Sequence, residues 1–447
     1  MIMNRVYVQK TLLLLAIILF TAVGSVQAKE YQLAGMFSLS YANGLKADWG
    51  NYALQCAQFA IEDVNNSGIL GDDKLAMKEE NISNYRCRIQ GSDVIAEKLF
   101  KKKNIIAMVG ADCSGPAVKI AKVGAKYKIP TISYGSNAES LSSVENFPYF
   151  IRVVSPSSVI DTSLIRTAQH FGAKTISIFH TTDAWGMGGM ESAAAEAKKL
   201  GLKADICGYP RNTNFYKVFT WLSRKKAMGI KHFAIIMPVP DTYTVYMAAK
   251  SLGMTKSGYY FYSSEMLSAD NPPKGIYAAI GSFAPKAKMP EGKKIDQLRE
   301  KLSKVEGKII DANDVTFYWG VMGYDNIWAV AHAIKLAKDD GVTNITGEKL
   351  MPYLRKINYE GLSGKISIRP GTNDRAAMDL NIMNLRGYAD PENGYFNHWL
   401  RKIFAPKSLN IVYEPIGVLD STNDTLSIDI NKVILTGGGK PCASCLK

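Results

Sequence analysis

The stretch DCSGP at residues 112–116 is followed closely by IPTISYGSNAESL at residues 129–141. Apolar runs at residues 105–109 and 129–132 predict two buried strands, each ending in a loop of small, hydroxyl-bearing residues. Because parallel strands of one sheet end at the same edge, we expect the two loops to meet there. Backbone N–H groups and Ser and Asn side chains at helix starts can hold a small anion such as a carboxylate. The loops therefore predict a binding site and imply no reaction.

Strands and helices alternate along most of the chain. We expect strands at residues 31–36, 105–110, 129–134, 175–180, 233–237 and 259–262, and helices at residues 52–65, 94–100, 118–127, 163–171, 190–200, 244–252, 294–304 and 320–337. This alternation predicts the α/β fold class, with a doubly wound parallel sheet in each of two lobes. Ligands of such sheets bind at the carboxyl ends of the strands, where the two loops lie.

The first 28 residues have the pattern of an export signal. Arg5 and Lys10 precede an apolar run at residues 11–20, and residues 26–28 form a small-residue cleavage site. The run is short for a membrane span, and no later run approaches the length of about 20 residues that a spanning helix needs. We expect cleavage after Ala28 and a mature chain that is soluble in the periplasm. No cysteine lies near this cleavage site, so a lipid anchor is not expected.

The composition is that of a globular protein. Of 447 residues, 47% are hydrophobic and 21% are charged, and the formal net charge is +14. An exported chain is not expected to meet nucleic acid. We interpret the positive charge as a solvated surface, and the alternative is attraction of anionic ligands or of an acidic partner.

The residues do not support an enzyme. A nucleophile elbow around Ser114 would need glycine at position 112, where Asp112 stands, and Ser114 has no evident base. The segment GMGG at residues 186–189 lacks the full dinucleotide-binding pattern. The histidines, which are not paired at metal-ligand spacings, are His170, His180, His232, His332 and His398. We expect no catalytic residue, no metal and no cofactor.

An ordered set of further motifs accompanies the two loops. These are AIEDVN at residues 60–65, YFIRVV at 149–154, DAWG at 183–186 and SSE at 263–265. Together the motifs resemble the type I periplasmic binding proteins, in particular the leucine/isoleucine/valine-binding branch of ABC-transporter substrate-binding proteins. The same fold occurs in the ligand domains of metabotropic glutamate receptors. The resemblance runs over residues 30–385.

The resemblance implies two doubly wound parallel-sheet lobes joined by a three-strand hinge. We expect residues 29–152 and 284–366 in lobe one, residues 153–283 in lobe two, and residues 367–447 as a return to lobe two with a C-terminal extension. We expect the crossovers near residues 151–155, 281–286 and 364–371, where the last segment looks like an extended linker.

The resemblance also implies a ligand-binding set. Ser114 and Asn137, with backbone groups of Gly135 and Ser136, match the positions that hold the ligand carboxylate. Glu265 matches the acidic residue that takes the ligand ammonium. A carboxylate buried by closure needs a cationic or hydrogen-bonding partner, which a protonated amine supplies. The alternative is an exposed loop glutamate. Aromatic residues around the ligand are expected at Trp49, Trp185 and Trp319, for which core packing is the alternative.

Two departures from the branch bear on specificity. Pro238 stands where the branched-chain binders offer a tyrosine to the ammonium, and Asn137 replaces a threonine. An amino acid remains the leading ligand class despite these departures, and short amides, urea-like compounds and aromatic carboxylates are the alternatives.

Cysteine usage fits an oxidising compartment. The resemblance implies a disulfide between Cys87 and Cys113. Cys442 and Cys445 lie close together in the sequence. No neighbouring His or Cys could complete a zinc site with them, and we interpret them as a short-loop disulfide or an exposed pair. Cys56 and Cys207 are expected to be buried.

We therefore expect an exported, non-catalytic solute-binding protein that closes on a small polar ligand. Its partner would be the membrane permease of an ABC transporter, and we expect a monomer. The alternative is a ligand-sensing receptor domain that acts on a signalling partner. An exported hydrolase, the third possibility, would have to show turnover.

Overall fold

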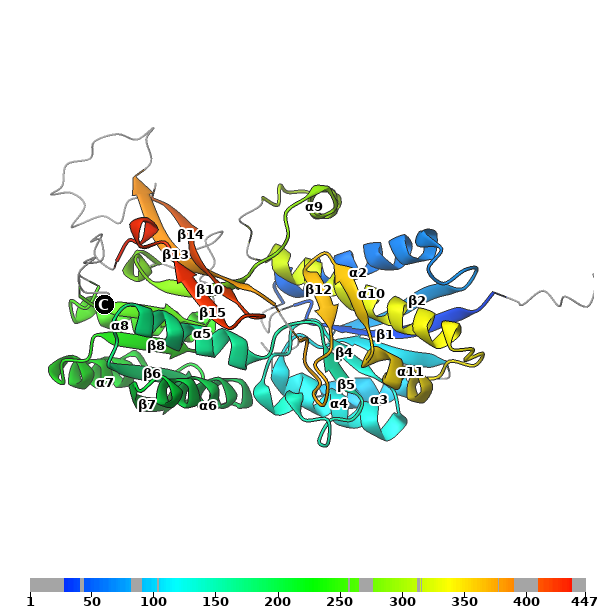
Figure 1. Cartoon of the computed structure of the whole chain (residues 1–447), viewed down its shortest axis with the longest axis horizontal. Coiled ribbons are helices and arrows are strands. Elements are labelled where there is room, and N and C mark those ends of the chain that lie inside the picture. The colour runs from blue at the N-terminus through cyan, green and yellow to red at the C-terminus, as the bar shows by residue number, and fades with distance from the viewer. Residues whose placement is uncertain are drawn as a thin grey trace, which may run out of the picture.

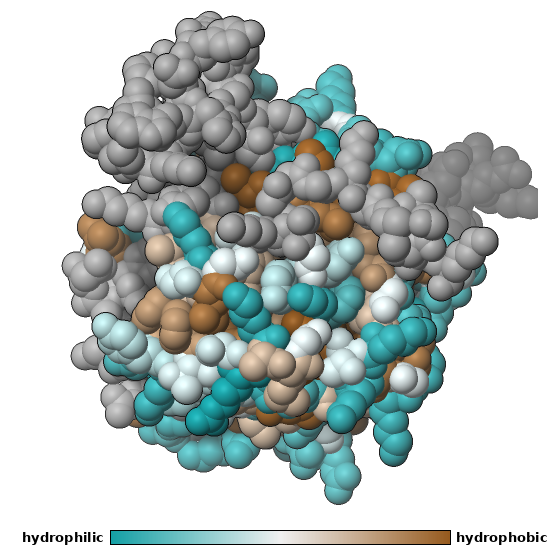
Figure 2. All heavy atoms as spheres, turned by 90° about the vertical axis from the view of Figure 1, so that its left-hand side faces the viewer, coloured by the Kyte–Doolittle hydropathy of each residue, from teal (hydrophilic) through white to brown (hydrophobic). Residues whose placement is uncertain are grey.

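The computed structural model describes residues 28–40, 44–81, 91–102, 104–255, 258–264, 276–311, 314, 316–376, 378–389 and 409–435. It has two lobes that lie side by side, with lobe one at the right and lobe two at the left of Figure 1. The end of lobe two that is remote from lobe one faces the viewer in Figure 2.

Lobe one is built on a five-stranded parallel sheet with the order β2-β1-β3-β4-β5. The strands are β1 (Glu30–Phe37), β2 (Lys74–Asn81), β3 (Ile105–Gly110), β4 (Thr131–Ser133) and β5 (Phe150–Arg152). One face packs against α2 (Asp48–Ser67), α10 (Phe317–Asp339) and α11 (Gly347–Leu354), and the other against α3 (Ser92–Phe100) and α4 (Ser114–Tyr127). The helix α9 (Lys293–Glu306) packs on α2. The sheet is thus covered on both faces, which explains the continuous apolar run of its central strand β3.

Lobe two contains an eight-stranded sheet with the order β15-β14-β13-β10-β9-β8-β6-β7. The strands β6 (Thr175–Thr181), β7 (Lys203–Tyr209), β8 (His232–Ile236), β9 (Tyr260–Ser263) and β10 (Phe283–Ala287) are parallel. The strands β13 (Leu380–Ala389), β14 (Leu409–Asp420) and β15 (Thr425–Ile428) add an antiparallel edge. The helices α5 (Ser157–His170) and α6 (Ala184–Lys199) cover one face, and α7 (Phe215–Ala227) and α8 (Val239–Ser251) cover the other.

The predicted fold class is confirmed, since both lobes contain parallel sheets with helices on both faces. The structure adds β7 and α7, which the sequence pattern did not single out. β7 is an edge strand whose residues are mostly half-buried or exposed, so it lacks the apolar run that marked the central strands.

Within the described residues, three connections join the lobes. The first links β5 to α5 through residues 153–156, and the second links β10 to α9 through residues 288–292. The third leads from β12 (Gly364–Ser367), which pairs with β11 (Asn358–Gly361), to β13. The second and third connections begin later than the expected crossovers, because β10 extends to Ala287 and residues 364–367 form half of a hairpin.

The helices α2 and α10 pack against each other at glycine positions of α10. A Cβ atom added at Gly323 would lie 2.3 Å from the carbonyl oxygen of Ala53, and one added at Gly320 would lie 2.9 Å from the Cys56 sulfur. At Gly323 the near atom belongs to the backbone of α2, so only glycine allows this approach of the two helices. No helix among the described residues combines the length and the apolar composition needed to cross a membrane.

His232, the first residue of β8, is 8% exposed. Its Nδ1 atom lies 3.0 Å from the Tyr262 hydroxyl, and its ring stacks on Tyr260 with centroids 4.6 Å apart. Burial lowers the pKa of this imidazole from 6.5 to about 4. Since the unfolded chain then binds more protons than the folded chain, stability should fall as the pH falls from 6.5 to about 4.

We predict that His232→Gln removes this part of the acid sensitivity. The shift corresponds to about 3 kcal/mol of unfolding free energy between pH 6.5 and pH 4. Urea unfolding of the wild type and of His232→Gln across this pH range measures the effect. The difference between their free energies of unfolding should shrink as the pH falls. A difference that stays constant with pH would contradict the prediction.

Candidate functional site

The strand orders place a candidate ligand site at the facing edges of the two sheets. In doubly wound sheets ligands bind beyond the carboxyl ends of the strands where the order reverses. The order reverses between β1 and β3 in lobe one and between β6 and β8 in lobe two. Between these edges, α6 contacts α4 and the short helix η1 (Glu139–Ser142). A Cβ atom added at Gly188 of α6 would lie 3.3 Å from the Glu139 backbone nitrogen.

Asp112 ties together the strand ends at the lobe-one edge. Its carboxylate accepts hydrogen bonds from Ser38 Oγ at 2.8 Å, from the Cys113 N–H at 2.8 Å and from the Tyr134 hydroxyl at 3.1 Å. Burial raises the pKa of this carboxyl, and the three donors oppose that shift. Asp112 therefore has a structural role. Sequence reasoning did not find this role, and it noted Asp112 only because an enzyme motif would need glycine at that position.

Three of the predicted lobe-one residues, Gly135, Ser136 and Asn137, lie together in one loop, which we call the ligand loop (residues 133–142). The N–H groups of Gly135 and Ser136 donate to Ser133 Oγ at 3.2 and 2.8 Å. Ser133 Oγ in turn donates to the carbonyl oxygen of Ala111 at 2.6 Å. Both backbone donors that were expected to bind the ligand thus already have an acceptor, and a ligand could only share them.

Ser114 and Asn137 flank these backbone groups. Ser114 begins α4, and its Oγ accepts a hydrogen bond from the Ala138 N–H at 3.1 Å. Because it acts as an acceptor there, the hydroxyl can still donate its own hydrogen. Asn137 is half-buried, and its backbone carbonyl oxygen accepts from the N–H of Ser157, the first residue of α5, at 2.6 Å. The ligand loop therefore contacts lobe two directly.

The three predicted tryptophans are all half-buried. Trp319 reaches the ligand loop, since a Cβ atom added at Gly135 would lie 3.2 Å from its Cζ3 atom. Trp49 lies in the first turn of α2, and Trp185 lies in the first turn of α6, partly packed on the lobe-two core. Glu265 lies outside the described residues.

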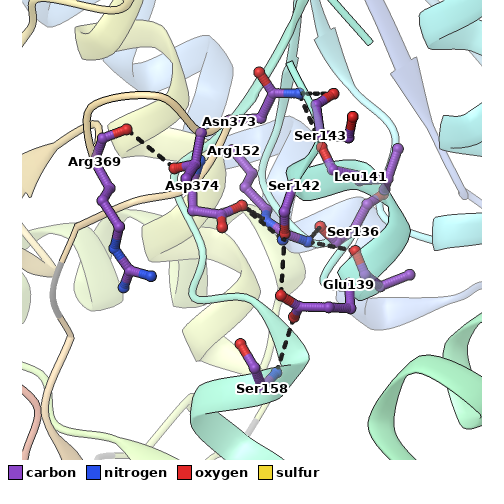
Figure 3. Close-up of polar contacts among 12 residues, drawn as sticks. Ser136, Glu139, Leu141, Ser142, Ser143, Arg152, Ser158, Arg369, Asn373 and Asp374 are labelled. Carbon is purple, nitrogen blue, oxygen red and sulfur yellow. Dashed lines mark hydrogen bonds and ion pairs between the residues drawn. The ribbon is translucent and has the colours of Figure 1, made fainter. Parts of the chain in front are cut away.

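A fully buried arginine, Arg152, fixes the ligand loop (Figure 3). Its guanidinium donates to the carbonyl oxygens of Ser136 at 3.2 Å and Ala138 at 2.8 Å, and to Ser142 Oγ at 2.6 Å. Its Nε donates to Asp374 at 2.8 Å. Because Asp374 lies on the third connection, one side chain joins the ligand loop to the hinge.

Neighbouring side chains extend this junction. The Asn373 amide donates to the carbonyl oxygens of Leu141 at 2.9 Å and Phe147 at 3.1 Å. Glu139 accepts from the N–H of Ser158 in α5 at 3.4 Å, which places a negative charge at the start of a lobe-two helix.

A second buried arginine, Arg375, joins the first and third connections. It donates to the carbonyl oxygen of Val153 at 3.0 Å and to the Ser363 hydroxyl at 2.8 Å. Ser363 in turn donates to the Asp325 carboxylate of α10 at 2.5 Å. Burial lowers the pKa of both arginines, and the carboxylates of Asp374 and Asp325 oppose the shift at Arg152 and Arg375 respectively.

These hinge residues were missed by sequence reasoning. Arg152 was quoted within a motif but received no role, and Asp374 and Arg375 lie in a polar segment without periodicity. The one available signal was an arginine inside the apolar run of residues 149–154, since a buried arginine requires a partner.

A surface cavity of about 430 Å³ lies elsewhere on lobe two. It is lined by charged residues at the ends of α5 and α6, where Arg166 pairs with Glu196 at 2.7 Å and also with Asp424. We place the candidate site at the facing sheet edges, because the charges of this cavity are already paired within the protein.

Cys113 is disulfide-bonded, and Cys56 and Cys207 are free thiols. Cys87, Cys442 and Cys445 lie outside the described residues, so the pairing of Cys87 with Cys113 stays a prediction. Among the described residues, no group of three or more His, Cys, Asp or Glu side chains could hold a metal ion.

We predict that Asp374→Asn destabilises the fold and loosens the ligand loop. Removing one partner of a buried ion pair typically costs about 3–5 kcal/mol. Thermal unfolding measures the loss, and amide hydrogen exchange should increase at residues 133–142. The matched control is Glu348→Gln, which breaks the exposed pair with Lys128 and should change the melting temperature little. Equal effects of the two substitutions would contradict the assigned role of Asp374.

Comparison with known proteins places these features in a family. The family model described as receptor family ligand binding region matches residues 52–387. The chain is 21% identical to glutamate receptor 2.2 of Arabidopsis thaliana over 415 residues, covering 87% of this chain and 43% of that receptor. It is 23% identical to metabotropic glutamate receptor-like protein E of Dictyostelium discoideum, with 67% of this chain and 38% of that protein covered. The chain thus spans less than half the length of these curated relatives.

The family match covers the ligand loop and the three connections. It is broader than the predicted leucine/isoleucine/valine-binding branch, and the two relatives are named as receptors rather than as transporter components. The family is defined by ligand binding and not by catalysis. With its two parallel-sheet lobes and facing strand ends, this chain belongs to the receptor family ligand-binding region.

Proposed function

We propose that this chain is an exported ligand-sensing domain that closes its two lobes around an amino acid. The observation that carries the proposal is the family match over residues 52–387, within which the carboxyl edges of both sheets face each other. The names of the glutamate receptors among its relatives favour an amino acid as ligand and a receptor as the setting.

The ligand carboxylate would bind at the ligand loop. Ser114 can donate its hydroxyl hydrogen there, and the half-buried Asn137 amide lies beside the backbone donors that Ser133 already engages. Trp319 would form one wall, because it packs against Gly135. Trp49 and Trp185 would contribute from the first turns of α2 and α6.

Closure would be transmitted through the hinge. The ligand loop is bonded to Asp374 through Arg152, and its Asn137 and Glu139 contact the start of α5. A ligand that tightens this loop would therefore act on both a connection and a lobe-two helix. Such coupling requires that the ligand bind the closed arrangement better than the open one.

Delivery of the ligand to an ABC transporter in the periplasm is the second candidate. The order of motifs that resembles the leucine/isoleucine/valine-binding branch favours it. We rank it below sensing, because the relatives that cover most of this chain are named as receptors. The disulfide between Cys87 and Cys113 remains part of either proposal.

We predict that a free L-amino acid raises the melting temperature of the purified chain. A ligand at about 100 times its dissociation constant stabilises the folded state by roughly 2.7 kcal/mol. Thermal unfolding with single amino acids, glutamate and leucine among them, and with short amides, urea and benzoate tests the ligand class. A shift with an amide or with benzoate alone would contradict the amino-acid assignment.

Glu265→Gln tests how the ammonium is bound. If Glu265 pairs with the ammonium on closure, the substitution should weaken amino-acid binding by about 3–5 kcal/mol and leave an uncharged analogue nearly unaffected. Calorimetry on both proteins measures the loss. Glu191→Gln, at an exposed position of α6, is the matched control. If amino acids bind but Glu265→Gln changes nothing, the role of Glu265 is wrong while the proposed function stands.

A further inference from the structure

Lobe two has a cluster of lysines at the end remote from the ligand site. We call this cluster the lysine pole, and it consists of Lys174, Lys198, Lys203, Lys226 and Lys231. Three of these residues lie at or just before the starts of the parallel strands β6, β7 and β8, and two lie in the last turns of α6 and α7. The pole therefore occupies the amino-terminal edge of the sheet, opposite the carboxyl edge that faces lobe one.

All five side chains are exposed, and within the described part of the chain none of them forms an ion pair. Lys226 donates to the carbonyl oxygen of Leu252, and Lys231 lies over the Tyr259 ring at 4.2 Å. Nearby carboxylates already have other cationic partners. Asp205 pairs with Lys225 at 2.7 Å, and Glu196 pairs with Arg166.

The corresponding edge of lobe one differs. There Lys338 pairs with Asp73 at 2.8 Å and Lys128 pairs with Glu348 at 2.6 Å, whereas Lys29 and Lys74 donate to backbone carbonyl oxygens. Cations near helix C-termini are favoured by the helix dipole in both lobes. The lysine pole differs from this edge in that none of its five lysines forms an ion pair within the described part of the chain.

An exposed apolar side chain lies among these charges. Met228 follows α7, between Lys226 and Lys231, and is 63% exposed. Hydrophilic and apolar residues are mixed on the face that Figure 2 presents. Lysine is depleted in protein–protein interfaces, where arginine and aromatic residues are enriched. Flexible, hydrated lysine charges instead suit a diffuse anionic surface, as at the headgroups of a bilayer.

We propose that the lysine pole binds the surface of a membrane that contains anionic phospholipids. Several lysines would act together through charge attraction, with Met228 entering the headgroup region. Binding in this orientation would hold the facing sheet edges away from the bilayer, where a ligand can reach them. The interaction requires no amino-acid ligand, so it can fail or succeed independently of the proposed function.

The test is flotation of the whole chain with vesicles. Vesicles of phosphatidylcholine and phosphatidylglycerol should bind the chain at low salt, and vesicles of phosphatidylcholine alone should not. Raising the salt should release the chain, because exposed charges are screened over about 10 Å at 0.1 M ionic strength. The double substitution Lys226→Glu and Lys231→Glu should weaken binding by at least about tenfold.

A double substitution on lobe one with the same change in net charge, Lys335→Glu and Lys349→Glu, serves as the control and should retain most of the binding. Unchanged circular dichroism and melting temperature establish that both variants fold. Equal losses in the two variants, equal binding to both kinds of vesicle, or no binding at low salt would each overturn the proposal. Retention on immobilised polyglutamate without binding to anionic vesicles would assign the pole to an acidic protein instead.

Discussion

The buried guanidinium of Arg152 constrains the whole junction between the lobes. A charged group without water must have its donors satisfied, because an unpaired buried charge costs several kcal/mol. Here the acceptors are two ligand-loop carbonyl groups, the Ser142 hydroxyl and Asp374, which is 222 residues away in the chain. These partners can meet only when the loop after β4 and the third connection adopt one arrangement. The shape of the candidate site thus depends on a residue that is expected to make no ligand contact.

The two edges of each parallel sheet carry different properties. Strand ends and helix starts meet at the carboxyl edge, where backbone N–H groups point outward and favour anionic groups. In lobe one, Asp112 and Ser133 use part of this donor capacity to hold the loops, which leaves Ser114 and Asn137 as the flanking polar side chains. At the amino edge of lobe two, helix ends and lysines combine into a positively charged surface. One fold therefore presents two chemically distinct faces.

Much of the fold could be predicted from local pattern. The apolar run of residues 105–110 matches β3, and the predicted helix at residues 320–337 lies within α10. The late elements were less accessible. The strand β12 was interpreted as an extended linker, because its pairing with β11 depends on a contact that no periodicity reveals. The long antiparallel pair β13 and β14 was likewise not predicted, since neither segment alternates with a helix as the parallel strands do.

The sequence by itself determined the fold class and the position of the small-residue loop at residues 133–142, because apolar periodicity and small polar residues after a strand are local properties. Only the tertiary structure decided how that loop is used. It showed that the N–H groups of Gly135 and Ser136 donate to Ser133, that Arg152 selects Asp374 as its partner, and that the lysines of the pole lack carboxylate partners. Each of these depends on which groups approach within hydrogen-bond distance after packing, and residues far apart in the chain reach that distance only through the complete fold.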